Sequence, residues 1–331
     1  MKTSANVDAS IVQWAERGFN RSPVSRARAK GLTGLRLNLK PPQNAPRQSA
    51  GAVRARIGSI AKRTPQVMVR ISGGGKGMRH IRAHLAYITR NGKLPAIDQN
   101  DDRHLGRDEL RELGHEMQFG GFPVAEVSAR REAFNIILSM PEGTEAGAVC
   151  RAALRFAADE FHGYQYAMVL HSYDSDPYKD PARHPHVHLC VKAMGDDGRR
   201  LNPRKQDLQR WRERFAERLR EQGIDAAASS RLERLQPKRG EKQSVLHKKA
   251  RGETTHTFDT RKTRPERAAR AQRLEILMLE RYKQLAYILA DSPEPDDRRL
   301  AATLGYSLAE TRGEMGRGQS GRPQYVDKER T

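Results

Sequence analysis

The sequence is short of cysteine, of long apolar runs and of acidic residues. Its two cysteines, Cys150 and Cys190, are too few for a disulfide framework or a four-cysteine zinc site, and they suit a reducing compartment. No stretch approaches 18 consecutive apolar residues, and residues 1–19 lack the apolar core of a secretion signal. We therefore expect a cytoplasmic protein without a membrane span.

Positive charge is present in excess. The chain of 331 residues has 61 Lys and Arg against 40 Asp and Glu, which gives a net charge of +21 and a pI of about 10.3. A charge this large seldom serves folding, and it favours a polyanionic partner, with nucleic acid as the first candidate. Because only 37% of the residues are hydrophobic, we expect parts of the chain to lie outside a packed core.

Most of this excess lies near the two ends. Residues 1–64 carry 13 Lys and Arg but two acids, and their apolar periodicity is weak. We expect a largely disordered basic arm that contacts DNA phosphates, with one short helix near residues 9–18. Residues 236–331 are expected to form a basic linker, one long helix over about 263–290 and a disordered tail. The apolar stripe of that helix should pack on the protein's own core or on a partner helix.

Between residues 65 and 235 the apolar pattern is periodic and predicts one domain. Strands are expected at residues 66–72, 134–140, 164–170 and 186–192. Helices are expected at residues 78–93 and 145–161 and after Asn202, with one or two more on the surface within 94–130. This order predicts an α+β fold in which a central, mostly antiparallel sheet has helices packed on one face.

The segment RHPHVHL holds three of the eleven histidines in the chain. Alternate residues of a strand face the same side, so His186 and His188 project together and can bind one metal ion. His171 ends the preceding strand and is the favoured third ligand, while His184 is the rival, although Pro185 disturbs its pleat. Three neutral imidazoles suit Zn, Mn, Fe, Co or Ni better than Mg. Surface histidines without a metal, and a structural zinc site, remain alternatives.

Tyr87 is the candidate nucleophile. It lies on the helix at residues 78–93, beside the apolar stripe, and is flanked by His84, Arg90 and Lys93. A tyrosine hydroxyl near a Lewis-acidic metal can attack phosphorus, although tyrosine on an amphipathic helix is more often a boundary residue.

The glycine run GGGKG precedes that helix. It lacks the GxxxxGK[ST] spacing of a nucleotide-binding loop. Its glycines would instead let backbone amides approach a DNA phosphate, with Lys76 adding charge, or they form a flexible turn.

Together these segments resemble the relaxases of plasmid mobilisation and conjugation, in the branch that includes the T-DNA border nickase. The resemblance covers residues 66–235 and rests on the glycine run, "HLAYITRNGKL", "NIILSMPEGTEAG" and "YAMVLH…HPHVHL", which occur in that order. The segment His186-Val187-His188 matches the His-hydrophobic-His signature of the wider endonuclease superfamily. The family fold is a palm-like central antiparallel sheet flanked by helices.

The resemblance implies an activity and a set of partners. It implies metal-dependent, strand-specific nicking and rejoining of single-stranded DNA at a transfer origin, with Tyr87 left on the 5′ phosphate and a free 3′-hydroxyl. It further implies that His171, His186 and His188 bind one divalent ion, Mg or Mn. Partners would be accessory relaxosome proteins and a coupling protein or type IV secretion channel, and the protein would enter the recipient cell with the strand.

One feature departs from the family pattern. Relatives place only a few residues, among them an Asp, between the first histidine and the HPHxH element, whereas 12 residues separate His171 from His184 here. Asp174, Asp176 and Asp180 are candidates for the acid that orients a ligand, and we favour Asp174.

The predicted DNA contacts are Lys76, Arg79, Arg90 and Lys93. Two other functions stay open. One is a rolling-circle replication initiator of the same superfamily, and the other is a nonenzymatic origin-binding or autoregulatory protein.

Overall fold

The structure, a computed structural model, describes most of the chain and divides it into two compact units. The described residues are 3–18, 49–179, 181–235, 252 and 265–317. One unit is Thr64–Ala228, and the other combines Met1–Arg63 with Ser229–Thr331. Predictions for the middle of the basic arm, most of the basic linker, the last residues and Asp180 fall outside the described residues.

A single antiparallel sheet forms the centre of the unit Thr64–Ala228. Its strand order is β1-β4-β6-β5-β2-β3, and every neighbouring pair is antiparallel, as the sequence predicted. The strands in this order are β1 (Met68–Gly73), β4 (Ala133–Ser139), β6 (His186–Lys192), β5 (Tyr166–His171), β2 (Ala96–Asp98) and β3 (Arg103–His104). The apolar strand β4 is central, because β1 and β6 cover its two edges.

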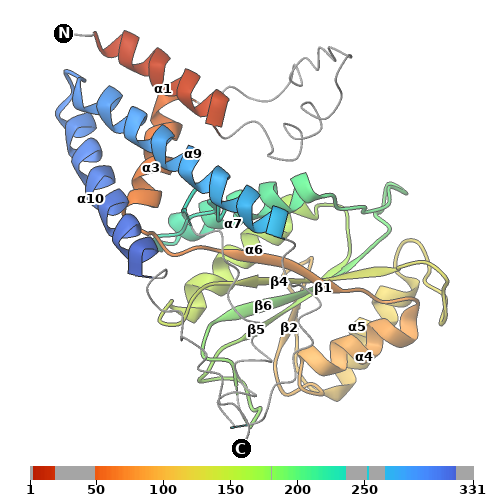
Figure 1. Cartoon of the computed structure of the whole chain (residues 1–331). Helices are drawn as coiled ribbons and strands as arrows, with labels where there is room; N and C mark the ends of the chain where they lie inside the picture. The colour runs from red at the N-terminus through yellow and green to blue at the C-terminus, as the bar shows by residue number, and fades with distance from the viewer. Residues whose placement is uncertain (1–2, 19–48, 180, 236–251, 253–264, 318–331) are drawn as a thin grey trace, which may run out of the picture. The chain divides into compact units, whose positions relative to one another are not determined.

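Helices cover both faces of this sheet, whereas the sequence led us to expect one covered face (Figure 1). One face packs against α4 (Met78–Ile88) and α5 (Arg107–Phe119), and the other against α6 (Ala146–Glu160) and α7 (Lys205–Glu221). Both faces are covered because the central strands are apolar at successive positions. In β5, for example, Met168 packs in the core with α6 and α7, and Val169 packs in the core with α4 and α5. We had expected the helix within residues 94–130 to lie on the surface, whereas α5 buries Leu113 and Met117 against the sheet.

Aromatic side chains join α6 to α7. Phe161 meets Trp211 edge to face at a centroid distance of 5.4 Å, and Phe156 meets Phe215 at 6.0 Å. All four are fully buried, and rings of this size dominate core energetics. Gly223, with φ of +78°, follows α7 directly, as predicted for its stop.

The described ends of the chain form a helical unit. Its helices are α1 (Ser4–Gly18), α3 (Ala50–Ala61), α9 (Pro265–Ala290) and α10 (Pro295–Arg317). Where we expected a largely disordered arm with one short helix, α1 and α3 bury Val7, Ile11, Val53 and Ile57 in a common core with α9 and α10. The sequence analysis also missed α10, although Pro295 at its first position is a usual helix start.

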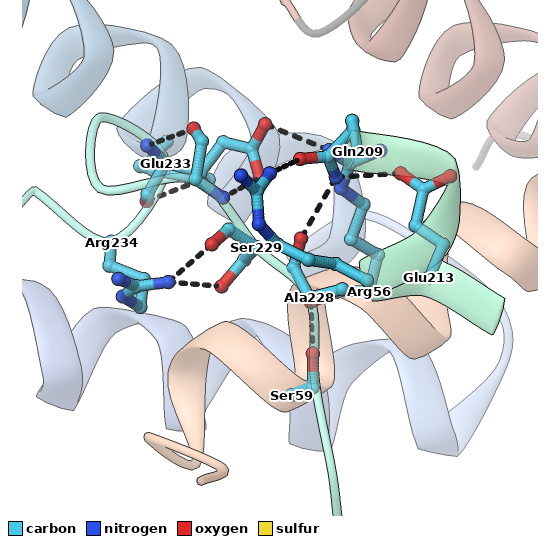
Figure 2. Close-up of polar contacts among 11 residues, drawn as sticks. Arg56, Ser59, Gln209, Glu213, Ala228, Ser229, Glu233 and Arg234 are labelled. Atoms are coloured by element: carbon cyan, nitrogen blue, oxygen red, sulfur yellow. Dashed lines mark hydrogen bonds and ion pairs between the residues drawn. The ribbon is translucent and has the colours of Figure 1, made fainter. Parts of the chain in front are cut away.

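Ion pairs tie these helices together. Arg54 of α3 donates two hydrogen bonds to buried Asp297 of α10, at 2.6 and 2.9 Å, and it also pairs with Asp8 of α1. Arg56 donates to Glu233 at 2.8 Å (Figure 2).

In the part of the chain that the structure describes, we find no helix with the length and hydropathy needed to cross a bilayer.

Candidate active site and metal centre

The pairing of β5 with β6 brings three histidines together. His171 lies directly opposite His186 in the register, and His188 follows His186 by two residues on the same face. The ring centroids are 4.7 Å apart for His171 and His188 and 5.1 Å apart for each of the other two pairs. One ring nitrogen of each lies within 4.8 Å of the others, so the predicted trio could hold one metal ion.

Burial keeps His186 and His188 neutral. It lowers the pKa of His186 to about 4 and that of His188 to about 2, so both carry lone pairs at neutral pH. The Nδ1 of His186 lies 3.1 Å from the carbonyl oxygen of His184, and a carbonyl can only accept, which leaves the Nε2 lone pair free. The Nδ1 of His188 is buried and finds no hydrogen-bond partner among the described residues. Free lone pairs on neutral imidazoles fit a divalent transition metal.

His171 connects the trio to α4. Its Nε2 lies 2.7 Å from the carbonyl oxygen of Ile88, so this nitrogen carries the ring proton. Its Nδ1 lies 3.1 Å from a guanidinium nitrogen of Arg90 and 3.0 Å from a carboxylate oxygen of Asp176. Burial lowers the pKa of His171 and outweighs the opposing pull of Asp176, so Nδ1 is left with its lone pair.

The acid beside the histidines is Asp176, not the favoured Asp174. Asp174 is exposed, whereas Asp176 is buried next to His171. Asp176 accepts hydrogen bonds from Arg90 Nε at 2.9 Å, from a terminal nitrogen of Arg90 at 2.8 Å and from the backbone of Tyr178 at 3.0 Å. The Arg90 guanidinium holds the pKa of Asp176 below its usual range, so the carboxylate is charged. The sequence offered three acids in this loop without periodicity to choose among them.

Tyr87 lies on α4 above these rings. Its ring centroid is 6.4 Å from that of His188, in an edge-on orientation, and 5.2 Å from the guanidinium carbon of Arg90. The side chain is 61% exposed, so a substrate can reach it. The structure therefore brings the predicted nucleophile and the predicted metal ligands into one site.

His84 is a member of the site to which the sequence analysis gave no role. One helical turn before Tyr87, it stacks on that ring at 6.4 Å and meets the edge of His188 at 6.3 Å. Its Nε2 is buried without a hydrogen-bond partner among the described residues, and burial lowers its pKa to about 4. The spacing of three residues between His84 and Tyr87 on a helix was the signal that could have placed it here.

Two backbone amides of the glycine run, for which we left open a phosphate contact or a flexible turn, are already engaged within the chain. The backbone amides of Gly75, Lys76 and Met78 already donate to acceptors within the chain. Gly77 has φ of +95°, and a Cβ there would clash with the carbonyl oxygen of Glu126. Gly77 therefore allows the segment around Glu126 to pack closely against the start of α4.

The four basic residues that we predicted to contact DNA are in different settings. Lys76, Arg79 and Lys93 are exposed, and their DNA contacts stay predictions. Arg90 is half-buried, with a pKa raised mainly by its hydrogen bond to Asp176. Its guanidinium is thus engaged within the site.

A second cluster, Asp98, His104 and Glu116, has ligand atoms at compatible distances. Asp98 is already satisfied, because one oxygen accepts from two backbone amides of the following turn and the other lies 3.4 Å from His104 Nε2. This carboxylate therefore stabilises the β2–β3 turn. A surface hollow of about 400 Å³ beside it is lined by Asp98, Arg151 and Tyr166 among others, and by none of the three histidines of the site.

Comparison with known proteins supports the resemblance. Residues 95–224 match the family model described as relaxase, MobA/VirD2-like, nuclease domain. This range is less than half of the chain, and it contains His171, His186 and His188 but not Tyr87. No curated protein matches the chain. The match shows that this part of the chain is similar to the nuclease domain of relaxases.

Proposed function

We propose that the protein is a metal-dependent relaxase that nicks and rejoins one DNA strand at a plasmid transfer origin, with Tyr87 as the nucleophile. The observation that carries this proposal is the placement of an exposed tyrosine beside three neutral histidines. Those histidines lie within the range that matches the relaxase nuclease domain. Four features of the sequence, from the glycine run to HPHVHL, point the same way.

His171, His186 and His188 would hold a divalent ion. The free Nε2 lone pair of His186 and the partnerless Nδ1 of His188 support this assignment. When bound, such an ion supplies Lewis acidity that polarises the scissile phosphate and offsets its developing negative charge. Mn fits an all-nitrogen donor set better than Mg, which would need waters and phosphate oxygens to complete its shell.

The reaction we propose is a transesterification. The Tyr87 oxygen forms a bond to the phosphorus of a phosphodiester in single-stranded DNA, and the bond from that phosphorus to the 3′ oxygen breaks. The proton of the tyrosine hydroxyl passes to the departing 3′ oxygen, so the products are a 5′-phosphotyrosyl link and a 3′-hydroxyl. The reverse reaction rejoins the strand, and no external energy source is needed because one ester replaces another.

Asp176 and Arg90 would position the reacting groups. Asp176 fixes the Arg90 guanidinium, which in turn donates to the Nδ1 lone pair of His171 and contacts the ring of Tyr87. Partners of this kind fix the orientation of metal-binding side chains. We therefore transfer to Asp176 the role first given to Asp174.

The wider role of the nick is also part of the proposal. Lys76, Arg79 and Lys93 would track the DNA backbone, in keeping with the charge of +21. We propose that the protein acts in the bacterial cytoplasm, with accessory proteins and a coupling protein or secretion channel. It would belong to the branch of the T-DNA border nickase and pilot the strand into a recipient. The motif resemblance supports these points.

The test incubates the purified full chain with single-stranded DNA carrying the cognate origin, labelled at the 5′ or at the 3′ end, in the presence of Mn²⁺. We expect a protein–DNA adduct that survives denaturation and retains the label only when it lies on the 3′ side of the nick. Tyr87→Phe should form no adduct. Adduct formation by Tyr87→Phe would contradict the assignment, and binding without any nicking would favour a nonenzymatic origin-binding protein.

A further inference from the structure

The loop between β5 and β6 has a feature that the nicking reaction does not require. Residues 172–185 form a longer connection than the family pattern has, and the loop displays two exposed aromatic side chains. Tyr173 is 55% exposed and Tyr178 is 60% exposed. Single exposed apolar side chains are common on protein surfaces, so exposure alone gives neither tyrosine a role. Their contacts distinguish the two.

Tyr178 is fixed to the site, although its ring is exposed. Its backbone amide donates to Asp176 Oδ1 at 3.0 Å, and its ring centroid lies 5.1 Å from the guanidinium carbon of Arg90. Asp176 in turn is anchored by a backbone hydrogen bond to Ser172 at 3.0 Å and by its contact with His171. The ring therefore has a defined place, with one face on a cation.

Arg90 carries a second ring, that of Tyr87, at 5.2 Å. The rings of Tyr87 and Tyr178 thus contact the same guanidinium, and both remain mostly exposed. Because both rings lie on one guanidinium, a base next to a phosphate at the Tyr87 hydroxyl can reach the ring of Tyr178. The charge of Arg90 is already paired with Asp176. DNA that approaches Tyr178 therefore meets an aromatic ring and not an unpaired cation.

We propose that Tyr178 binds a nucleobase beside the scissile phosphate by stacking, and so holds the single strand in register with Tyr87. This inference rests on the proposed function and adds a base-binding residue to it. The ligand class is an unpaired base of single-stranded DNA, and stacking tolerates any base because each has a π face. Base stacking on an aromatic side chain is sequence-tolerant, so origin specificity would come from other contacts.

The experiment separates base stacking from phosphate contacts. The full chain is titrated at one fixed salt concentration with fluorescein-labelled oligothymidylate and with an abasic strand of the same number of phosphates. Tyr178→Ala should weaken binding of the oligothymidylate by about 5- to 150-fold, the range that stacking of one base supplies, and should leave binding of the abasic strand unchanged. Tyr178→Phe, which keeps the ring, should bind both strands like the wild type.

Tyr173→Ala is the matched control, because Tyr173 lies in the same loop with similar exposure. It should bind both strands like the wild type. The proposal is overturned if Tyr178→Ala keeps full affinity for the oligothymidylate, if it weakens binding of both strands equally, or if Tyr173→Ala has the same effect. Failure of the proposed function is seen separately, as the absence of any adduct from the wild-type protein and origin DNA.

Discussion

Replacing Asp176 by Asn should impair the site more than any other single change in the loop between β5 and β6. The carboxylate accepts two charge-assisted hydrogen bonds from Arg90 and one from a backbone amide, and it lies 3.0 Å from His171 Nδ1. An amide of the same shape keeps only one acceptor oxygen and turns an NH₂ group toward a donor. We expect His171 and Arg90 to lose their fixed orientation.

The size of the effect follows from these contacts. Loss of a group that orients a metal-binding side chain costs about 10- to 100-fold in metal affinity or activity, which corresponds to roughly 1.4 to 2.8 kcal/mol. The stability loss should be smaller than the roughly 3 to 5 kcal/mol of a fully buried ion pair, because the Arg90 side chain is 17% exposed and Asn retains one hydrogen bond. Folding should therefore survive the substitution.

The assay measures Mn²⁺ affinity by calorimetry and adduct formation under single-turnover conditions, with a thermal melt of each variant. Asp174→Asn is the matched control, since Asp174 is an exposed acid of the same loop. We expect Asp174→Asn to behave as the wild type. A loss for Asp174→Asn that equals or exceeds that of Asp176→Asn would refute the assignment of the acid.

Three further predictions concern the metal, the helical unit and the arm. Chelation should abolish adduct formation and leave the circular dichroism spectrum unchanged, whereas unfolding on chelation would indicate structural zinc. Asp297→Asn should destabilise the helical unit by about 2 to 4 kcal/mol at pH 7. Unfolding of this unit can be measured by the fluorescence of Trp14 in a Trp211→Phe background, in which Trp14 is the one remaining tryptophan. Because Arg54 depresses the pKa of Asp297, wild-type stabilisation is present above the unfolded pKa of about 4 and is lost as pH falls through the folded pKa. An equal mutational loss at acid and neutral pH would contradict this linkage. Replacing the Lys and Arg of residues 21–47 by Gln should flatten the salt dependence of DNA binding by about 0.7 per lost phosphate contact, and an unchanged slope would exclude contact by this segment.

The central sheet and the histidine trio were predictable because strand periodicity fixes which residues share a face. Alternation in HVHLCVK separated His186 and His188 from Val187 and Leu189, and the latter two lie in the opposite core, as expected. The hairpin of β5 with β6 then placed His171 opposite His186. The strands β2 and β3 escaped prediction because segments of three and two residues carry no periodic signal.

The acid of the site was not predictable, because a loop has no period. Asp174 and Asp176 lie two residues apart, and only the turn closed by the hydrogen bond from the Asp176 amide to the Ser172 carbonyl decides which one points inward. The contacts of Arg90 with Asp176 and His171 were not predictable for a similar reason. Arg90 follows the end of α4 with φ of +53°, a conformation that no helical pattern encodes.

The sequence predicted α9 and most of α1, whereas α3, α10 and the core that these helices share were missed, because the contacts of this unit join residues far apart in the chain. The indole of Trp14 donates to the Arg281 carbonyl across 267 positions, and Arg54 pairs with Asp297 across 243 positions. Apart from α9, whose apolar stripe was recognised, these segments show weak apolar periodicity and many basic residues, which is typical of disorder. Only their mutual burial distinguishes them from a free arm and a free tail.

The central claim is that Tyr87 attacks the DNA within a site formed by β5, β6 and α4. The most direct measurement is peptide mapping by mass spectrometry of the adduct formed with single-stranded origin DNA and Mn²⁺. We expect a nucleotide on the peptide that contains Tyr87 and none on the peptides that contain Tyr173 or Tyr178. A nucleotide on any other tyrosine, with Tyr87 unmodified, would contradict the central claim.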